Sequence, residues 1–201
     1  FWCGTGAVRM KTRTWMFLGA AGLVLAGCAS LQGGGKNAGL AGAGAPEPRK
    51  PIDAEQHFAG RWYEIGRTPM RLTDGCVAGY TDYLRRDGRI VQRDGCRSGD
   101  PSGKEKVVAG PLRILNPGEN TKVRVDYRLF GFVPVPRTYW LLDHGDGWFI
   151  MATSDFKLVN LYTRAAQPSP ALVRELTERT RALGYDVRKL EFPRQFPPGQ
   201  G

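Results

Sequence analysis

The stretch that most constrains the fold is the octet Gly60–Arg67, which reads Gly-Arg-Trp-Tyr-Glu-Ile-Gly-Arg. Its aromatic and β-branched residues predict a β-strand, and the opening glycine permits a tight turn into it. Successive side chains of a strand point to opposite faces, so Trp62 and Glu64 share one face and Tyr63 and Ile65 the other. An indole beside a carboxylate favours a strand that floors a cavity. One more buried Trp in a packed sandwich is the alternative.

Seven further short strands follow at regular spacing, which is typical of an antiparallel sandwich or barrel. They are expected at residues 77–84, 89–96, 106–115, 122–128, 137–143, 148–153 and 157–164. Asp87-Gly88 and Gly145-Asp146-Gly147 are turn signals between them. Because the links are short, neighbouring strands should be antiparallel.

A helix is expected after the strands, from Ser169 to Gly184. Ser169 is a good N-cap, Pro170 fits the first helical position, and Gly184 supplies the C-terminal stop. The first strand and the last two offer apolar residues to both faces, so the apolar stripe of this helix is needed to cover them. One helix over the first and last strands makes these strands neighbours. The sequence therefore predicts an all-β, eight-stranded antiparallel up-and-down barrel over residues 51–192, with the helix packed outside and a loose tail at 193–201.

Residues 1–27 have the pattern of a secretory signal. Met10 is the expected start, because residues 1–9 show no structural logic; Lys11 and Arg13 precede an apolar run that is too short to span a bilayer. An amphipathic helix of the mature protein is the alternative.

The apolar run ends Leu25-Ala26-Gly27-Cys28, which resembles the bacterial lipoprotein lipobox. This resemblance implies that Cys28 is diacylated, and the Ala29-Ser30 that follows implies the outer membrane. Residues 28–50 then form a flexible linker rich in Gly, Ala and Pro.

The expected leader decides which of the four cysteines are left to form a disulfide. Cys3 lies before the expected start and Cys28 carries lipid, so Cys76 and Cys96 remain as a disulfide in an oxidising compartment, or as two free thiols. A two-residue turn at Asp87-Gly88 would set Cys76 opposite Gly99. Pairing of the two cysteines therefore needs a longer loop or a bulge.

The charge of the chain argues against a nucleic-acid partner. The 201 residues carry a formal charge of +10, which falls to +7 when the leader removes Arg9, Lys11 and Arg13. The surplus is spread along the chain without a basic run. An anionic membrane surface is therefore the expected partner.

In this order the motifs resemble the lipocalin family, in particular bacterial outer-membrane lipoprotein lipocalins, over residues 58–190. The matching motifs are Gly60-Arg61-Trp62-Tyr63-Glu64-Ile65, Cys76-Val77-Ala78-Gly79-Tyr80, Gly88-x-Ile90 before Cys96, Tyr139-Trp140-Leu141-Leu142 and the Arg164 that ends the last strand. The resemblance implies that Gly60, Trp62 and Arg164 are structural, with Arg164 packed across Trp62 at the closed end of the barrel.

An eight-stranded barrel is just wide enough to hold one small ligand. Matching the alternation to the family places twelve side chains inside: Glu64, Ala78, Tyr80, Ile90, Gln92, Leu112, Ile114, Val123, Val125, Tyr127, Tyr139 and Leu141. An apolar pocket with a few polar groups suits a fatty acid or a lysophospholipid; a solid core is the alternative. Gln92, Asp94 and Asn160 depart from the family pattern towards a more polar pocket.

The segment 129–136 joins the fifth and sixth strands at the open end and reads Leu-Phe-Gly-Phe-Val-Pro-Val-Pro. Five large apolar residues exposed there would be unusual. Three roles follow from this composition: contact with a membrane interface, gating of the ligand, or folding back as a lid.

Catalytic motifs are absent from the sequence. His57 and His144 lie far apart and are expected at the surface, and no nucleophile elbow, Cys-x-x-Cys, cofactor loop or metal-ligand spacing is present. We expect a non-enzymatic lipoprotein of the Gram-negative outer membrane that stores or transports fatty acids or lysophospholipids, with homodimerisation open. The alternative is a structural or assembly lipoprotein that binds another envelope protein through its barrel mouth.

Overall fold

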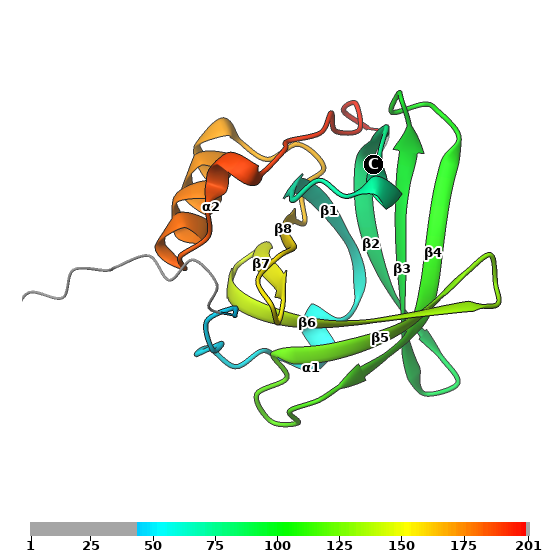
Figure 1. Cartoon of the computed structure of the whole chain (residues 1–201), viewed down its shortest axis with the longest axis vertical. Helices are drawn as coiled ribbons and strands as arrows, with labels where there is room; N and C mark the ends of the chain where they lie inside the picture. Colours follow the sequence, from blue (N-terminus) through cyan, green and yellow to red (C-terminus); the bar gives the residue numbers. More distant parts are fainter. Residues whose placement is uncertain (1–43, 200–201) are drawn as a thin grey trace, which may run out of the picture. The chain divides into compact units, whose positions relative to one another are not determined.

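The computed structural model describes residues 44–199, which form a closed barrel of eight antiparallel strands with one long helix outside it (Figure 1). The strands are β1 (Gly60–Arg67), β2 (Cys76–Arg86), β3 (Arg89–Ser98), β4 (Glu105–Ile114), β5 (Lys122–Leu129), β6 (Val133–Gly145), β7 (Trp148–Thr153) and β8 (Val159–Thr163). Because β1 pairs with both β2 and β8, the sheet has no free edge. The predicted fold is confirmed. The leader and Cys28 lie outside the described residues.

The two ends of the barrel differ. At the closed end lie the turns 87–88, 115–121 and 145–147, together with the short helix α1 (Ala54–His57). The chain before α1 is fixed to this end, since the Ile52 N–H donates to the Glu119 carbonyl at 2.9 Å. At the open end lie the loops 68–75, 99–104, 130–132 and 154–158, and these surround the mouth.

The β2–β3 hairpin contains the bulge that the cysteine spacing required. Arg86 lies opposite Arg89 across the two-residue turn, but the register shifts between Val77 and Tyr80, so Cys76 lies opposite Ser98. Ala78 has a φ of 48° within this bulge. The shift brings Cys76 and Cys96 together as a disulfide with their Cα atoms 5.5 Å apart. The predicted pairing is confirmed.

The helix α2 (Pro170–Ala182) covers the outer face of the last strands and the first. The Ser169 hydroxyl accepts from the Leu172 N–H at 3.2 Å, which caps the first turn. Leu176 is fully buried and belongs to a cluster that includes Ile65 and Leu161. The predicted external helix is therefore confirmed, and its role is to bury outward-facing apolar side chains of the barrel. No helix within residues 44–199 is both long and apolar enough to cross a bilayer.

The tail from Pro193 is packed as far as Phe196, and the expectation of a loose tail is wrong for residues 193–196. The bulge frees the Ala78 N–H from the β-ladder, and this group donates to the Arg194 carbonyl at 2.7 Å. Phe196 is 3% exposed, with its ring 5.9 Å from that of Tyr63 and 6.2 Å from that of Tyr80. The tail therefore covers the part of the outer face that α2 leaves open.

The packed tail predicts different effects for two phenylalanines close in sequence. Phe196→Ala should lower the free energy of unfolding by about 3 kcal/mol, because it removes a buried ring. Phe192→Ala is the control: Phe192 is 46% exposed, and its loss should be below about 1 kcal/mol. Urea unfolding measures both, and a loss for Phe196→Ala as small as that for the control would show that packing of the tail does not contribute to stability.

Candidate functional site

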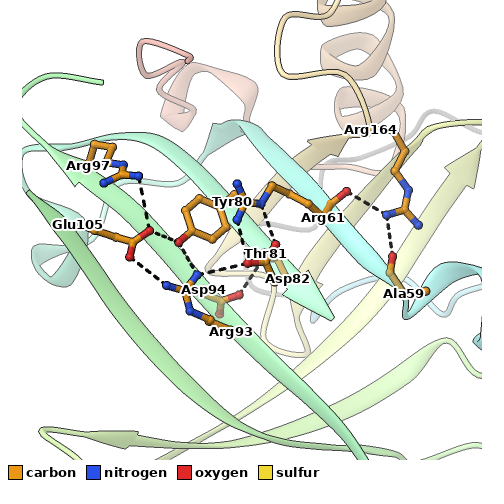
Figure 2. Close-up of polar contacts among 10 residues, drawn as sticks. All are labelled: Ala59, Arg61, Tyr80, Thr81, Asp82, Arg93, Asp94, Arg97, Glu105 and Arg164. Atoms are coloured by element: carbon orange, nitrogen blue, oxygen red, sulfur yellow. Dashed lines mark hydrogen bonds and ion pairs between the residues drawn. The ribbon is translucent and has the colours of Figure 1, made fainter. Parts of the chain in front are cut away.

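Trp62 forms the floor of the barrel interior at the closed end. Its ring is 4% exposed, and its Nε1–H donates to the His57 carbonyl at 3.0 Å. The Arg164 guanidinium lies 3.6 Å from the centre of the ring, so the expected contact is present. Arg164 also donates to the carbonyls of Ala59 and Arg61 at 2.7 and 2.9 Å (Figure 2). A cation–π contact of this kind contributes about 0.5–2 kcal/mol, so the floor is held firmly.

His57 packs beside Trp62, and the expectation that both histidines lie at the surface is wrong for this one. His57 is 7% exposed, with its ring 4.7 Å from Phe149 and 5.1 Å from Trp62. Burial, followed by the nearby His144 and Arg164, lowers the pKa of His57 to about 3, so its ring is neutral at physiological pH. Both histidines line an open hollow of about 480 Å³ beneath the floor.

Most of the predicted cavity residues do face the interior. Those that pack with Trp62 in one cluster are Ile90, Leu112, Val123, Val125, Tyr127, Tyr139 and Leu141. Ile114 packs against the same cluster. Because Val123 and Val125 have no exposed surface, the closed half of the interior is filled by side chains.

Phe149, Met151 and Tyr162 belong to the same cluster and were missed by the sequence analysis. Strands β7 and β8 are apolar on both faces, so alternation does not say which of their residues point inward. The aromatic stacking of Phe149 on Tyr162, with ring centres 4.7 Å apart, fixes the inward set.

Glu64 faces the interior, as predicted, one step above Trp62. Its Oε1 accepts from the Arg67 guanidinium at 2.9 Å, and its Oε2 accepts from Asn160 Nδ2 at 2.6 Å. Burial raises the pKa of the Glu64 carboxyl, while Arg67 and the bond from Asn160 act in the opposite direction. Burial therefore outweighs the ion pair.

A second carboxylate, Asp94, faces the interior from β3. It accepts from Thr81 Oγ1 at 2.7 Å, from Gln92 Nε2 at 3.1 Å, and from the Tyr127 hydroxyl. Burial raises the pKa of Asp94 against these hydrogen bonds, and within residues 44–199 Asp94 forms no ion pair. We call the set Glu64, Thr81, Gln92, Asp94, Tyr127 and Asn160 the polar band. The sequence departures at Gln92, Asp94 and Asn160 had indicated it.

Ala78 and Tyr80 point outward, so their assignment to the cavity is wrong. Tyr80 lies opposite Tyr63, which is on the outer face, and cross-strand partners share a face. The Arg61 guanidinium lies 4.1 Å from the Tyr80 ring, and the Tyr80 hydroxyl donates to Glu105 (Figure 2). Thr81 and Tyr83 take the inward positions of β2, because the bulge at Ala78 alters the alternation read from the sequence.

Towards the mouth the interior is less tightly enclosed. The inward side chains of Asp94, in the polar band, and of Val108 and Val135 are only partly buried, so solvent reaches this end of the interior. A second hollow of about 320 Å³ lies on the outer rim beside Cys76. Among the described residues no three His, Cys, Asp or Glu side chains converge as metal ligands. The arrangement is suited to holding an apolar molecule that carries a polar group.

Comparison with protein families gives one match that covers most of the barrel and the helix. Residues 52–195 match the family described as a lipocalin-like domain. A comparison with curated protein sequences gave no match.

Several solved structures share the architecture. Insecticyanin from the tobacco hornworm Manduca sexta superposes with a TM-score of 0.59 at 17% identity, covering 79% of this chain and 89% of its own. Lobster apocrustacyanin A1 gives 0.55 at 14% identity, with 77% and 92% covered. The cockroach allergen Per a 4 gives 0.54 at 14% identity, with 76% and 94% covered. At these identities the likeness establishes a shared fold.

The buried floor predicts a large effect of Trp62→Ala on stability. The free energy of unfolding should fall by about 3–5 kcal/mol, because the ring and its contact with Arg164 are both lost. Trp62→Phe keeps a ring under Arg164 and should lose clearly less. The choice of ligand should be unchanged in both variants, as Trp62 lies below the polar band. A loss under about 1 kcal/mol in urea unfolding would contradict this role.

Asp94 predicts a pH dependence of stability. A raised pKa favours the protonated carboxyl in the folded state, so its stabilising contribution is complete below the ordinary value of 3.8 and is lost as the pH rises through the raised value. Asp94→Asn removes this loss. The variant should therefore gain stability relative to the parent as the pH rises from about 4 to 8.

Urea unfolding at several pH values measures the difference between parent and variant. Asp146→Asn, in the exposed β6–β7 turn, is the control and should follow the parent. A difference between parent and Asp94→Asn that does not change with pH would show that the Asp94 carboxyl is not penalised by its surroundings.

Proposed function

The chain belongs to the lipocalin family, whose barrels bind small hydrophobic ligands, and from that premise we propose that this protein stores or transports fatty acids or lysophospholipids. The observation that carries the proposal is the polar band across an otherwise apolar interior. Apolar side chains such as Val108 and Val135 line the mouth above the band. An amphiphilic lipid matches this pattern, because its polar group bonds to the band while its hydrocarbon chain contacts the apolar wall.

The charges of the polar band favour a lysophospholipid over an ionised fatty acid. Glu64 and Asp94 already accept hydrogen bonds from neighbouring side chains inside the barrel. An ionised fatty acid would therefore add a third carboxylate beside them. A lysophospholipid instead offers a hydroxyl donor, and its phosphate remains near the mouth. Arg67, which is bound to Glu64 and Glu191, is the nearest counter-charge on β1.

The proposed membrane anchor is Cys28. The proposed location of the protein is the outer membrane of the cell envelope. Support for it comes from the lipobox-like ending Leu25-Ala26-Gly27-Cys28 and from the Gly- and Ala-rich segment that follows. Several acyl chains on one residue hold a protein to a bilayer far more firmly than a single chain. Anchoring would keep a lipid carrier beside its source.

Binding without catalysis is the activity proposed. Lipocalins are in general binding and transport proteins, and the neutral His57 lies beneath the floor, away from the polar band. The alternative is a structural or assembly lipoprotein that binds another envelope protein, with or without homodimerisation. Its support is the exposed apolar segment 129–136 at the mouth.

Asp94 supplies a direct test of the ligand class. Removing its charge with Asp94→Asn should improve binding of an ionised fatty acid relative to a lysophospholipid by about tenfold, which corresponds to one charged hydrogen bond or close charge pair. Displacement of a fluorescent fatty acid by palmitate and by a lysophospholipid measures the ratio.

Tyr83→Phe is the matched control, because the buried Tyr83 hydroxyl has no hydrogen-bond partner in the described part of the chain. This variant should keep the ratio of the parent. A barrel that rejects the fluorescent fatty acid and both lipids would contradict the proposed function. An unchanged ratio in Asp94→Asn would contradict the role of the polar band.

A further inference from the structure

The tip of the β5–β6 hairpin carries two exposed aromatic rings in a turn that disfavours one of them. Phe130 is 87% exposed and Phe132 is 72% exposed. The Phe132 N–H donates to the Leu129 carbonyl at 3.2 Å, and Phe130 and Gly131 both have positive φ, at 52° and 81°. The two central positions of this β-turn, both at positive φ, favour Asn or Asp before Gly, and a bulky residue at positive φ is an outlier.

The turn between β2 and β3 shows the usual choice. Asp87 and Gly88 adopt φ values of 49° and 71°, which closely match those at the hairpin tip. At the tip Phe130 replaces the favoured polar residue, although its ring gains almost nothing from burial in this chain. Folding stability therefore does not explain the phenylalanine.

The exposed apolar side chains of the barrel gather at one end. Within residues 44–199 seven large apolar side chains are exposed, and all but Leu115 lie on loops or strand ends at the open end: Leu72, Val107, Phe130, Phe132, Val133 and Phe192. The β5–β6 hairpin extends beyond β4 there (Figure 1). Its tip is exposed, so it does not fold back over the mouth as a lid. A one-sided apolar rim of this kind marks an interaction surface.

The charge next to the tip is positive. Arg128 lies beside it on β5, opposite Pro134; it is exposed, and no carboxylate lies within ion-pair distance of it among the described residues. The nearest acid on β5, Asp126, pairs with Arg113 at 3.0 Å and Arg124 at 2.7 Å. The tip is thus an apolar point beside one unneutralised basic side chain.

The chain enters the described structure at the same end. The Ala45 N–H donates to the carbonyl of Ser154, in the loop between β7 and β8, at 3.0 Å. Cys28, the proposed anchor, precedes this point in the sequence. An anchor that leads into the open end is consistent with a bilayer on that side.

We propose that the hairpin tip 129–135 inserts into the surface of an anionic phospholipid bilayer. Phe130 and Phe132 enter the boundary between head groups and acyl chains, and Arg128 binds a lipid phosphate. This contact places the barrel mouth next to the membrane. The proposal concerns the outer surface and does not require any particular ligand inside the barrel.

Vesicle binding tests the proposal without the anchor. The full chain carrying Cys28→Ser, which cannot be acylated, is sedimented with vesicles of equal parts phosphatidylethanolamine and phosphatidylglycerol, or of phosphatidylcholine alone. We expect binding to the anionic vesicles that weakens with salt. Absence of binding to the anionic vesicles would overturn the proposal.

Variants in the same background assign the binding to the tip. Phe130→Asn with Phe132→Ser should weaken vesicle binding on the order of 100-fold, because two rings no longer enter the lipid. Leu115→Ser, which removes an exposed apolar side chain at the closed end, should bind like the parent. Arg128→Gln should reduce the preference for anionic vesicles by about fivefold.

Folding stability separates this role from a structural one. Phe130→Asn relieves the turn, so its melting temperature should equal or exceed that of the parent while vesicle binding falls. Unchanged vesicle binding in the phenylalanine variant would overturn the proposal. So would crosslinking in cells that captures one envelope protein through the tip while vesicles do not bind. Lipid displacement on the same samples reports the interior separately.

Discussion

Closure of the sheet between β1 and β8 is the constraint on which the rest of the structure depends. It gives every strand an inner and an outer face and limits the interior to a narrow column. Trp62 and Arg164 close the column at one end, on the first strand and at the end of the last. The outer apolar side chains then need cover, which α2 and the tail provide.

Within the column the carboxylates set the chemistry. Glu64 and Asp94 are held in surroundings that raise both pKa values, and each is satisfied by hydrogen bonds from neutral or cationic partners. The filled, aromatic closed half supports them from below. The interior therefore combines a closed half filled by side chains with the polar band, which lies nearer the mouth.

Much of this could be predicted from the sequence, because local signals agreed with one another. The eight strands and the capped helix follow from alternation and turn residues, and the Cys76–Cys96 bridge follows from setting aside Cys3 and Cys28. The orientation of Tyr80 did not follow, since the cysteine spacing indicated a longer loop or a bulge without giving its position, and a bulge at Ala78 changes the alternation. Packing of Phe196 and burial of His57 depend on contacts distant in sequence, such as Ala78 with Arg194, which periodicity does not reveal.

The central claim is that the barrel interior holds one lipid, whose polar group bonds to the polar band. The most direct measurement is organic extraction of the purified full chain, followed by mass spectrometry and quantification against the protein. We predict recovery of one fatty acid or lysophospholipid molecule per chain, and its loss when the chain is unfolded before purification is completed. Recovery of no lipid, from protein that also fails to take up added lysophospholipid, would contradict the account.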